Sequence, residues 1–315
     1  MYKHEIPSPQ KVTKASASFS KKQNASTLLA DLKSLLKAPV LIANVLPVLT
    51  GFWLALYFSN ATFYEYWGMF LFTIIGSTFV IAGALVLNNW YDVDIDKVMA
   101  RTKKRPTVTG NFPLKLVLII GISLSILGFT LLFFTTLEAV LYAFIGWFTY
   151  VVLYTMWSKR KYTLNTVIGS VSGAVTPLIG WTVIAPGFHI VPIILFSILF
   201  IWQMPHTFAI AMRKYEEYKA AGVAMLPVVH GFKITKRQIV VYVACLLPLP
   251  FYLIELGIAF VVIATLLNLI YLGISISGLF TKDDQKYAYI SFLYSVSYIT
   301  ILYLLMVLMT LPIFW

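Results

Sequence analysis

A short polar segment carries acids and an amide at helical spacing. Asn88, Asp92 and Asp96 follow one another at intervals of four residues. In a helix these positions line one face, with neighbours about 6 Å apart. Their oxygens suit Mg²⁺, which usually binds one or two carboxylates and takes its other ligands from substrate phosphates and water. The alternative is a polar helix end that only anchors a membrane span at the interface. The cations that follow favour the metal site, and they are Lys97, Arg101, Lys103, Lys104 and Arg105.

The rest of the chain is too apolar for a soluble domain. Of 315 residues, 60% are hydrophobic and only 11% are charged, so too few polar side chains remain to cover a water-facing surface. The composition predicts an all-α, polytopic membrane protein with nine transmembrane helices. The split between the seventh and eighth rests only on Glu255 and Gly257. The apolar windows lie at 39–58, 67–90, 113–134, 138–157, 164–184, 190–212, 238–256, 257–279 and 288–311.

The basic residues predict the orientation. All 24 Lys and Arg fall on one side if the N-terminus is cytoplasmic, and the opposite loops hold Glu65, Glu138 and Glu255. This asymmetry follows the positive-inside rule, and an odd number of helices then places Trp315 outside. The net charge of +12 therefore faces the bilayer and anions, and nucleic acid is not implied because the cations form no separate basic domain.

The first residues differ from the rest. Residues 1–26 are rich in Ser, Lys and Gln, which predicts a disordered cytoplasmic arm without a cleavable signal peptide, followed by one transmembrane domain over 27–315. The arm has no Arg, which favours a bacterial plasma membrane over a mitochondrial one. The single cysteine, Cys245, lies within a predicted span, so no intramolecular disulfide can form.

Two charged loops end in the same pattern, Pro-x-Val-x-Gly, at 106–110 and 227–231. Four predicted helices separate them. This weak repeat suggests two four-helix halves plus a ninth helix around a central cavity, with the two loops facing each other.

The second loop offers a cationic surface. Helical spacing places Lys214 and Tyr218 on one face, with Arg213 and Glu217 beside them. The alternative is a solvated turn at the interface. Opposite the first loop, this surface suits a diphosphate, and a prenyl diphosphate would also need an apolar slot for its tail. Aromatic faces could stabilise the allylic cation that ionisation produces, although most aromatic residues must pack or contact lipid. Those near the same membrane face are Trp90, Tyr91, Tyr150, Tyr154, Trp157 and Trp202.

His206 is an ionisable group inside a predicted span. It follows Pro205 and lies about two helical turns, roughly 10 Å, from Arg213. Ionisable groups in a membrane are functional candidates. The alternative is a neutral histidine that bonds a neighbouring helix and compensates the Pro205 kink.

These motifs resemble a known family. Asn88-xxx-Asp92-xxx-Asp96 with Arg105-Pro106 resembles the first signature of the UbiA-type intramembrane prenyltransferases. More narrowly, three stretches resemble the protohaem IX farnesyltransferases within it: 153–160 (Leu-Tyr-Thr-Met-Trp-Ser-Lys-Arg), 165–181, and 202–206 continuing to 226–229. The superfamily usually has a second Asp-rich motif where this chain has Lys214-xxx-Tyr218 with Glu217. That departure argues against two symmetrical Asp-bound Mg²⁺ sites and suggests that the second loop binds diphosphate more directly.

The resemblance implies farnesyl transfer from farnesyl diphosphate to a vinyl group of haem b, giving haem O. We hypothesise that Asn88, Asp92 and Asp96 hold Mg²⁺ on the diphosphate and that His206, with Trp202 nearby, contacts haem, either at iron or by positioning the added water. Haem A synthase or terminal oxidase assembly factors would be partners. Charge on the diphosphate would be offset by Arg101, Arg105, Lys159, Arg160, Arg213 and Lys214, with Glu217 and Tyr218 orienting them.

Two rivals remain open at this point. One is a prenyltransferase acting on a quinone precursor or another aromatic acceptor, which the second-loop pattern and His206 disfavour. The other is a membrane transporter, for which charges near mid-span would be expected, whereas the acids here cluster at one membrane face.

Overall fold

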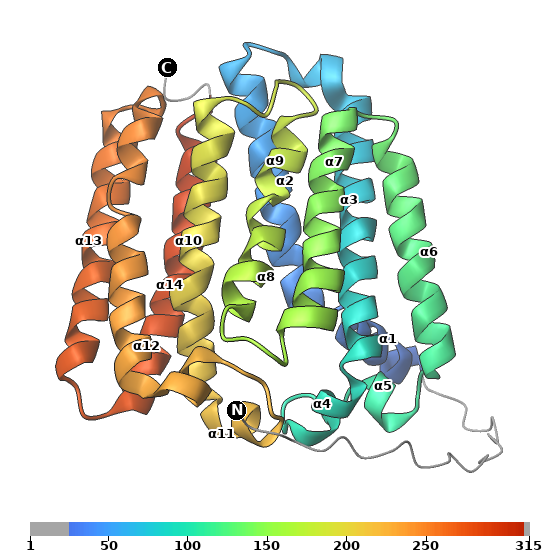
Figure 1. Ribbon diagram of the computed structural model, residues 1–315. Helices are drawn as coiled ribbons and strands as arrows, with labels where there is room; N and C mark the ends of the chain where they lie inside the picture. The colour runs from blue at the N-terminus through green and yellow to red at the C-terminus, as the bar shows by residue number, and fades with distance from the viewer. Residues whose placement is uncertain (1–24, 312–315) are drawn as a thin grey trace.

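The computed structural model describes residues 25–311, and every regular element in that range is helical (Figure 1). The arm expected over residues 1–26 lies outside the described residues except at its last two positions, where the first helix already begins. The expected position of Trp315 lies outside them as well.

The longer helices are α2 (Ala38–Phe58), α3 (Phe63–Tyr91), α6 (Leu114–Leu132), α7 (Leu137–Phe148), α10 (Ile190–Arg213), α12 (Leu226–Cys245), α13 (Ile258–Phe280) and α14 (Asp284–Leu308). The shorter ones are α1 (Ala25–Leu35), α4 (Val93–Val98), α5 (Pro106–Thr109), α8 (Asn165–Ala174), α9 (Thr176–Trp181) and α11 (Tyr215–Ala220). A π-helix, η1 (Thr149–Ser158), continues α7, and a 3₁₀-helix, η2 (Leu249–Leu256), follows α12.

Eight helical segments of the described range are long and apolar enough to cross a membrane, so the expected count of nine is not confirmed. The difference lies at 164–184, which folds as α8 and α9, each too short to cross alone. Pro177 lies in the first turn of α9 and has no N–H to donate to the carbonyl of Gly173. The hydroxyl of Thr176 donates to that carbonyl instead, at 2.6 Å. The expected boundary between the seventh and eighth spans lies at Gly257. This residue follows the end of η2 and adopts a φ of 98°.

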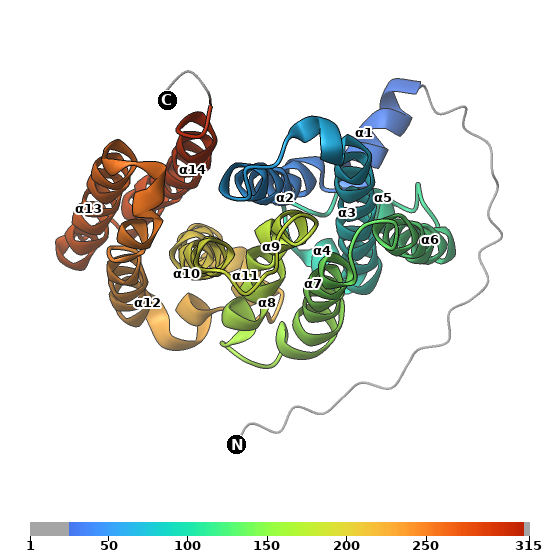
Figure 2. The same ribbon diagram turned by 90° about the horizontal axis from the view of Figure 1, so that it is seen from above.

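The helices stand side by side in one bundle. Figure 2 shows α6 and α13 at its two ends, with α2, α9 and α10 in the middle. The short helices α1, α4, α5 and α11 gather at one end of the bundle, below the long helices in Figure 1. Both charged loops therefore meet at the same end.

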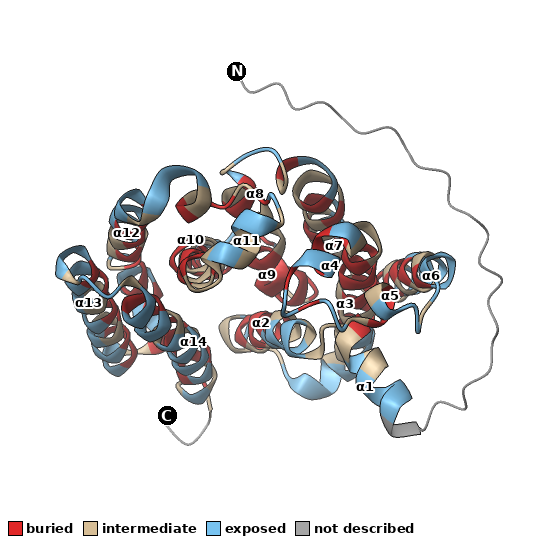
Figure 3. Cartoon of the chain, turned by 90° about the horizontal axis from the view of Figure 1, so that it is seen from below, coloured by how far each residue is buried: buried red, intermediate tan, exposed pale blue. Residues whose placement is uncertain are grey.

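The outside of the bundle is apolar. Figure 3 shows buried residues turned toward the middle, while α6 and α13 expose their outer faces. Ile126 is 62% exposed, Ile258 74% and Phe280 81%. Exposed apolar side chains on the outer helices suit contact with lipid, as expected for a polytopic membrane protein.

Glycines let α9 pack against α2 at very short range. A Cβ at Gly180 would lie 1.9 Å from the carbonyl oxygen of Val48, and one at Gly51 would lie 2.0 Å from that of Pro177. Small residues at such crossings let backbones approach closely, which is how membrane helices associate without a hydrophobic driving force. This contact holds the broken segment in the middle of the bundle.

The repeated loop pattern has a common local structure. Pro106 and Pro227 each lie in the first turn of a helix, α5 and α12 respectively. Gly110 and Gly231 each adopt a positive φ, 84° and 76°, which glycine alone adopts without strain. In both loops the pattern thus marks a helix start followed by a glycine with positive φ. Gly110 ends α5 in the left-handed region with ψ 2°, whereas Gly231, with ψ 171°, kinks α12.

Candidate active site

The predicted column of oxygen ligands is present at the end of α3. The backbone N–H of Asp92 bonds the carbonyl of Asn88, and that of Asp96 bonds the carbonyl of Asp92, both at 2.9 Å. Helical geometry therefore continues from α3 through Asp92 into α4. The side chains of Asn88, Asp92 and Asp96 are almost fully buried, and the Asn88 amide donates to Asp92 Oδ2 at 2.8 Å.

Cations from three different segments converge on this column. Lys159, just after η1, forms an ion pair with Asp92. Arg105, at the start of α5, lies with Nη1 2.5 Å from Asp96 Oδ2. Lys37, between α1 and α2, donates to Asn88 Oδ1. The acids and cations form one buried cluster, hereafter the polar cluster.

Lys37 is a member that the sequence reasoning missed. It caps α2 in a left-handed conformation, with φ 48°. Nearby, the Asn89 side chain donates to the carbonyl of Leu35 at 2.7 Å and ties α1 to α3. Burial, with the charges of Arg105 and Lys159, holds the pKa of Lys37 well below its ordinary value. In the sequence, a lone lysine before a span indicates only an interfacial anchor.

The π-helix η1 packs against the polar cluster through Thr155. The wider turn lets the Thr155 hydroxyl donate to the carbonyl of Tyr150, five residues back, at 2.8 Å, while it accepts from Asn88 at 2.9 Å. The rings of Tyr150 and Tyr154 stack with centroids 5.6 Å apart. Lys159 lies 5.8 Å from the Tyr154 ring centre.

Arg160 lies mainly outside the polar cluster. Its Nη1 and Nη2 donate to Oδ2 and Oδ1 of Asp94 at 2.6 and 2.7 Å. Its guanidinium lies 5.3 Å from the centre of the Tyr91 ring. The contact with Asp92 Oδ1 is longer, 3.7 Å. Asp94 is well exposed on the opposite side of the segment from the column.

The second loop covers the first. Tyr218 packs in a small apolar cluster with Ile95 and Met99 of the first loop. Glu217 accepts from the backbone N–H of Arg101 at 3.4 Å and pairs with Lys214 at 2.9 Å. The hydrogen bond from Lys214 holds the pKa of Glu217 below its ordinary value. Glu217 thus connects the two loops.

Two predicted phosphate ligands, Arg213 and Lys214, have partners outside the polar cluster. The guanidinium of Arg213 lies over Tyr289 and Phe292 of α14, and Lys214 is engaged by Glu217. The exposed Arg101 contributes its backbone to Glu217.

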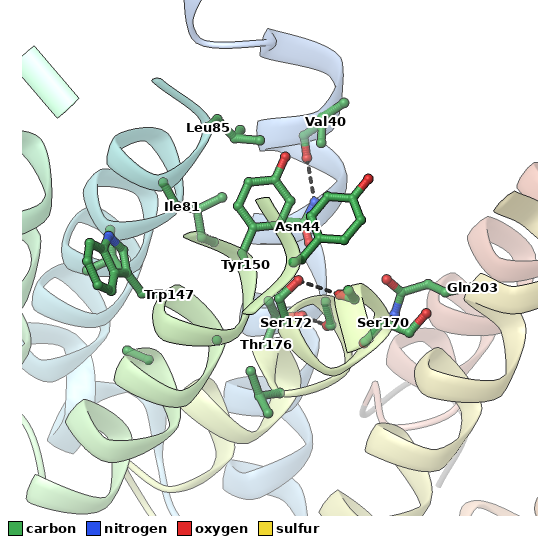
Figure 4. Close-up of a pocket in the computed structure, with 18 of the residues that line it drawn as sticks. Val40, Asn44, Ile81, Leu85, Trp147, Tyr150, Ser170, Ser172, Thr176 and Gln203 are labelled. Atoms are coloured by element: carbon green, nitrogen blue, oxygen red, sulfur yellow. Dashed lines mark hydrogen bonds between the residues drawn. The ribbon is translucent and has the colours of Figure 1, made fainter. Parts of the chain in front are cut away.

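A largely apolar cavity of about 240 Å³ lies in the bundle, lined from α2, α3, α7, η1, α8, α9 and α10. Figure 4 shows Asn44, Leu85 and Tyr150 projecting into it, with Gln203 on the α10 side. Tyr154 also lines it and lies beside Lys159. The apolar space therefore adjoins the polar cluster through a tyrosine.

His206 and Trp202 lie on the α14 side of α10. Their rings stack at 4.7 Å, and the His206 ring lies 5.4 Å from that of Phe292. His206 Nδ1 is 2.7 Å from the Ser295 hydroxyl, and the Trp202 indole donates to the Ser295 carbonyl at 2.8 Å. The structure therefore contains the neighbouring-helix bond expected of a packing histidine.

The oxygen set fits a divalent cation. Asp92 Oδ1 is buried and accepts no hydrogen bond in the described part of the chain. Between residues 25 and 311, no group of three or more His, Cys, Asp or Glu side chains is arranged to hold a metal. The candidate site consists of two carboxylates and one amide, from Asp92, Asp96 and Asn88, the small protein share typical of Mg²⁺ sites completed by substrate phosphates.

The family model for UbiA prenyltransferases matches residues 44–296, which include the column, both loops and most of the cavity lining. The chain belongs to the UbiA prenyltransferase family. The relatives of this UbiA chain include the protoheme IX farnesyltransferase of Oceanobacillus iheyensis, 56% identical over 94% of this chain and 95% of that one. That of Geobacillus kaustophilus is 52% identical over 89% and 91%.

Solved structures share the UbiA fold at lower identity. A structure of digeranylgeranylglyceryl phosphate synthase matches with a TM-score of 0.73 and 20% identity, over 90% of this chain and 98% of that one. A UbiA homologue from Archaeoglobus fulgidus, bound to DMAPP and Mg²⁺, matches with a TM-score of 0.67 and 16% identity, over 86% and 99%. These matches show the fold.

Proposed function

We propose that this UbiA prenyltransferase transfers the farnesyl group of farnesyl diphosphate to a vinyl group of haem b, with addition of water, to give haem O and diphosphate. The observation that carries the reaction class is the polar cluster beside an apolar cavity, which suits a substrate with a charged head and an apolar tail. The acceptor follows from relatives of 52–56% identity that carry the name protoheme IX farnesyltransferase.

The polar cluster binds the diphosphate in this proposal. Lys37, Lys159 and Arg105 are partly buried basic side chains that can donate to phosphate oxygens. Asn88, Asp92 and Asp96 would hold Mg²⁺, and the Mg²⁺ bound in the solved UbiA homologue supports a divalent metal in this family. When bound, Mg²⁺ offsets the charge that develops on the leaving diphosphate.

The tyrosines and the cavity act on the farnesyl group. The bond between C1 and the diphosphate oxygen breaks, and its electron pair leaves with diphosphate. A vinyl carbon of haem bonds to C1, water adds to the resulting cation, and one proton is lost. Tyr150 and Tyr154 can stabilise positive charge at C1 with their ring faces. The apolar cavity holds the chain away from water, which limits hydrolysis.

The finer architecture is part of the proposal. We infer that α8 and α9 together cross the membrane, so that the bundle has nine spans arranged as two four-helix halves plus a ninth helix. The column, both loops and the N-terminus would be cytoplasmic in a bacterial plasma membrane, since the basic loops gather at one end of the bundle. Haem A synthase or terminal oxidase assembly factors would take the product.

Product analysis tests this function. Membranes containing the protein are given farnesyl diphosphate and haem b, and the pigments are extracted and separated by mass. Haem O should form, and it should be absent from membranes with the Asp92→Asn variant. Prenylation of a quinone precursor without any farnesylated haem would replace this proposal with the aromatic-acceptor reading.

A further inference from the structure

Arg213 has an unusual position among the cations of the site. It ends α10, and its guanidinium lies 4.7 Å from the ring centre of Phe292 and 5.0 Å from that of Tyr289. In the part of the chain that the structure describes, it has no ion pair with a carboxylate. Contact with two ring faces holds the guanidinium in place through cation–π attraction, which does not use up its N–H donors.

Phe292 connects Arg213 to His206. The His206 ring lies 5.4 Å from the Phe292 ring and stacks on Trp202. His206 and Arg213 are seven residues apart on α10, which corresponds to about 10 Å along the helix. The interface between α10 and α14 therefore contains a row of aromatic rings. His206 lies along this row inside the bundle, and Arg213 lies at the end where both loops are found.

A cleft opens beside Arg213. Its volume is about 500 Å³, and its walls come from the end of α10, α11, the start of α12 and Gln285 of α14. Lys214 also lines it but is paired with Glu217, while Glu216 is exposed. Arg213 is thus the cation of this cleft that has no carboxylate partner in residues 25–311.

We propose that Arg213 binds the propionate carboxylates of the haem acceptor, and that it is not a diphosphate ligand. This assignment rests on the proposed function. A guanidinium matches a carboxylate with two parallel hydrogen bonds. The propionates occupy one edge of the haem and must stay near water, whereas the vinyl groups lie on the rings away from that edge. Propionates held at Arg213 would direct the vinyl edge inward, past His206.

In this arrangement each anionic substrate has its own basic side chains. The diphosphate has Lys37, Lys159 and Arg105 in the polar cluster. The carboxylates of haem would have Arg213 on the other side of the second loop. The two anionic substrates then do not compete for one set of cations, and both can be bound at once.

The test compares haem b with its dimethyl ester, whose propionates carry no charge. Purified protein in lipid nanodiscs is assayed with each acceptor and farnesyl diphosphate. Arg213→Gln should raise the KM for haem b by roughly 10- to 100-fold, the effect of losing a charge-assisted hydrogen bond to a carboxylate. The KM for the dimethyl ester and the KM for farnesyl diphosphate should stay unchanged.

Two further variants make the result specific. Arg213→Lys keeps the positive charge but cannot form two parallel hydrogen bonds to a carboxylate, so it should give an intermediate KM for haem b. Arg237→Gln removes an exposed cation of α12 and should behave as wild type. Thermal unfolding of each variant is measured alongside, and unchanged kinetics with the ester show that the site is folded.

Other results would overturn the proposal. A rise in the KM for farnesyl diphosphate alone would show that Arg213 binds the diphosphate. An equal loss with haem b and its ester would make Arg213 a packing residue. If wild-type protein forms no farnesylated haem at all, the proposed function fails, whereas product formation without discrimination by Arg213 removes only the propionate site.

Discussion

Lys159 forms an ion pair with Asp92 although 67 residues separate them in the chain. The pair joins the end of η1 to the end of α3, beside the tyrosines that line the cavity. The carboxylate therefore already holds a buried cation when it meets the substrate. Because Asp92 is buried and Lys159 is only 14% exposed, replacing either partner removes the charge that balances the other.

The carboxylates of the column should be essential. Asp92→Asn and Asp96→Asn each should lower turnover by at least roughly 100-fold, because the electrostatic stabilisation of the leaving diphosphate is lost. Steady-state assays in nanodiscs over a range of Mg²⁺ concentrations measure this. Asp94→Asn is the matched control and should change turnover less than about threefold, since its pair with Arg160 is exposed. Full activity of Asp92→Asn with an unchanged Mg²⁺ dependence would remove the metal assignment.

Substitution of His206 distinguishes a haem contact from a packing role. If it contacts haem, His206→Ala should alter the absorption spectrum of bound haem and weaken haem binding, with farnesyl diphosphate affinity unchanged. Titrations followed by absorbance measure both. Ser295→Ala, which removes the partner of Nδ1, should leave most haem binding intact. A stable His206→Ala protein with wild-type haem affinity and spectrum would argue for packing alone.

The crossing of α2 and α9 should not tolerate a methyl group. Gly180→Ala places a Cβ 1.9 Å from the Val48 carbonyl oxygen, so the helices must separate at a cost of roughly 1 to 3 kcal/mol or more. Thermal unfolding in detergent measures the loss. Gly273→Ala in α13 meets nothing within 4 Å and should leave stability unchanged or slightly higher. Equal melting of both variants would contradict the close approach.

The Lys214–Glu217 pair should give a pH-dependent contribution to stability. The pKa of Glu217 is lowered in the fold, so its stabilisation is present above the ordinary value of 4.5 and is lost as pH falls through the lower folded pKa. The difference in melting temperature between wild type and Glu217→Gln should be constant near neutral pH and should shrink below pH 4.5. A difference that grows in acid would contradict the sign.

Single cysteines can test the orientation. In a Cys245→Ser background, Lys103→Cys and Lys219→Cys should react with a membrane-impermeant thiol reagent from the cytoplasmic side. Phe188→Cys, at a position 96% exposed, should react from the other side. Labelling of positions 103 and 219 from opposite faces would be incompatible with one site built from both loops.

The sequence alone determined the features that depend on local periodicity. Asn88, Asp92 and Asp96 share a face because helical hydrogen bonds repeat along neighbouring residues, and the structure retains them. The membrane class followed from composition, and Gly257 marked a helix boundary because its positive φ suits glycine.

Only the tertiary structure decided which cations meet the column. Lys37 reaches Asn88 because a left-handed turn and the Asn89 bond to Leu35 place it there. Arg213 turns instead to the rings of α14, 76 residues or more further along the chain. Long basic side chains take their direction from segments distant in sequence, so spacing cannot predict it. For the same reason, hydropathy did not show the break between α8 and α9, which depends on Pro177 and on packing against Gly51.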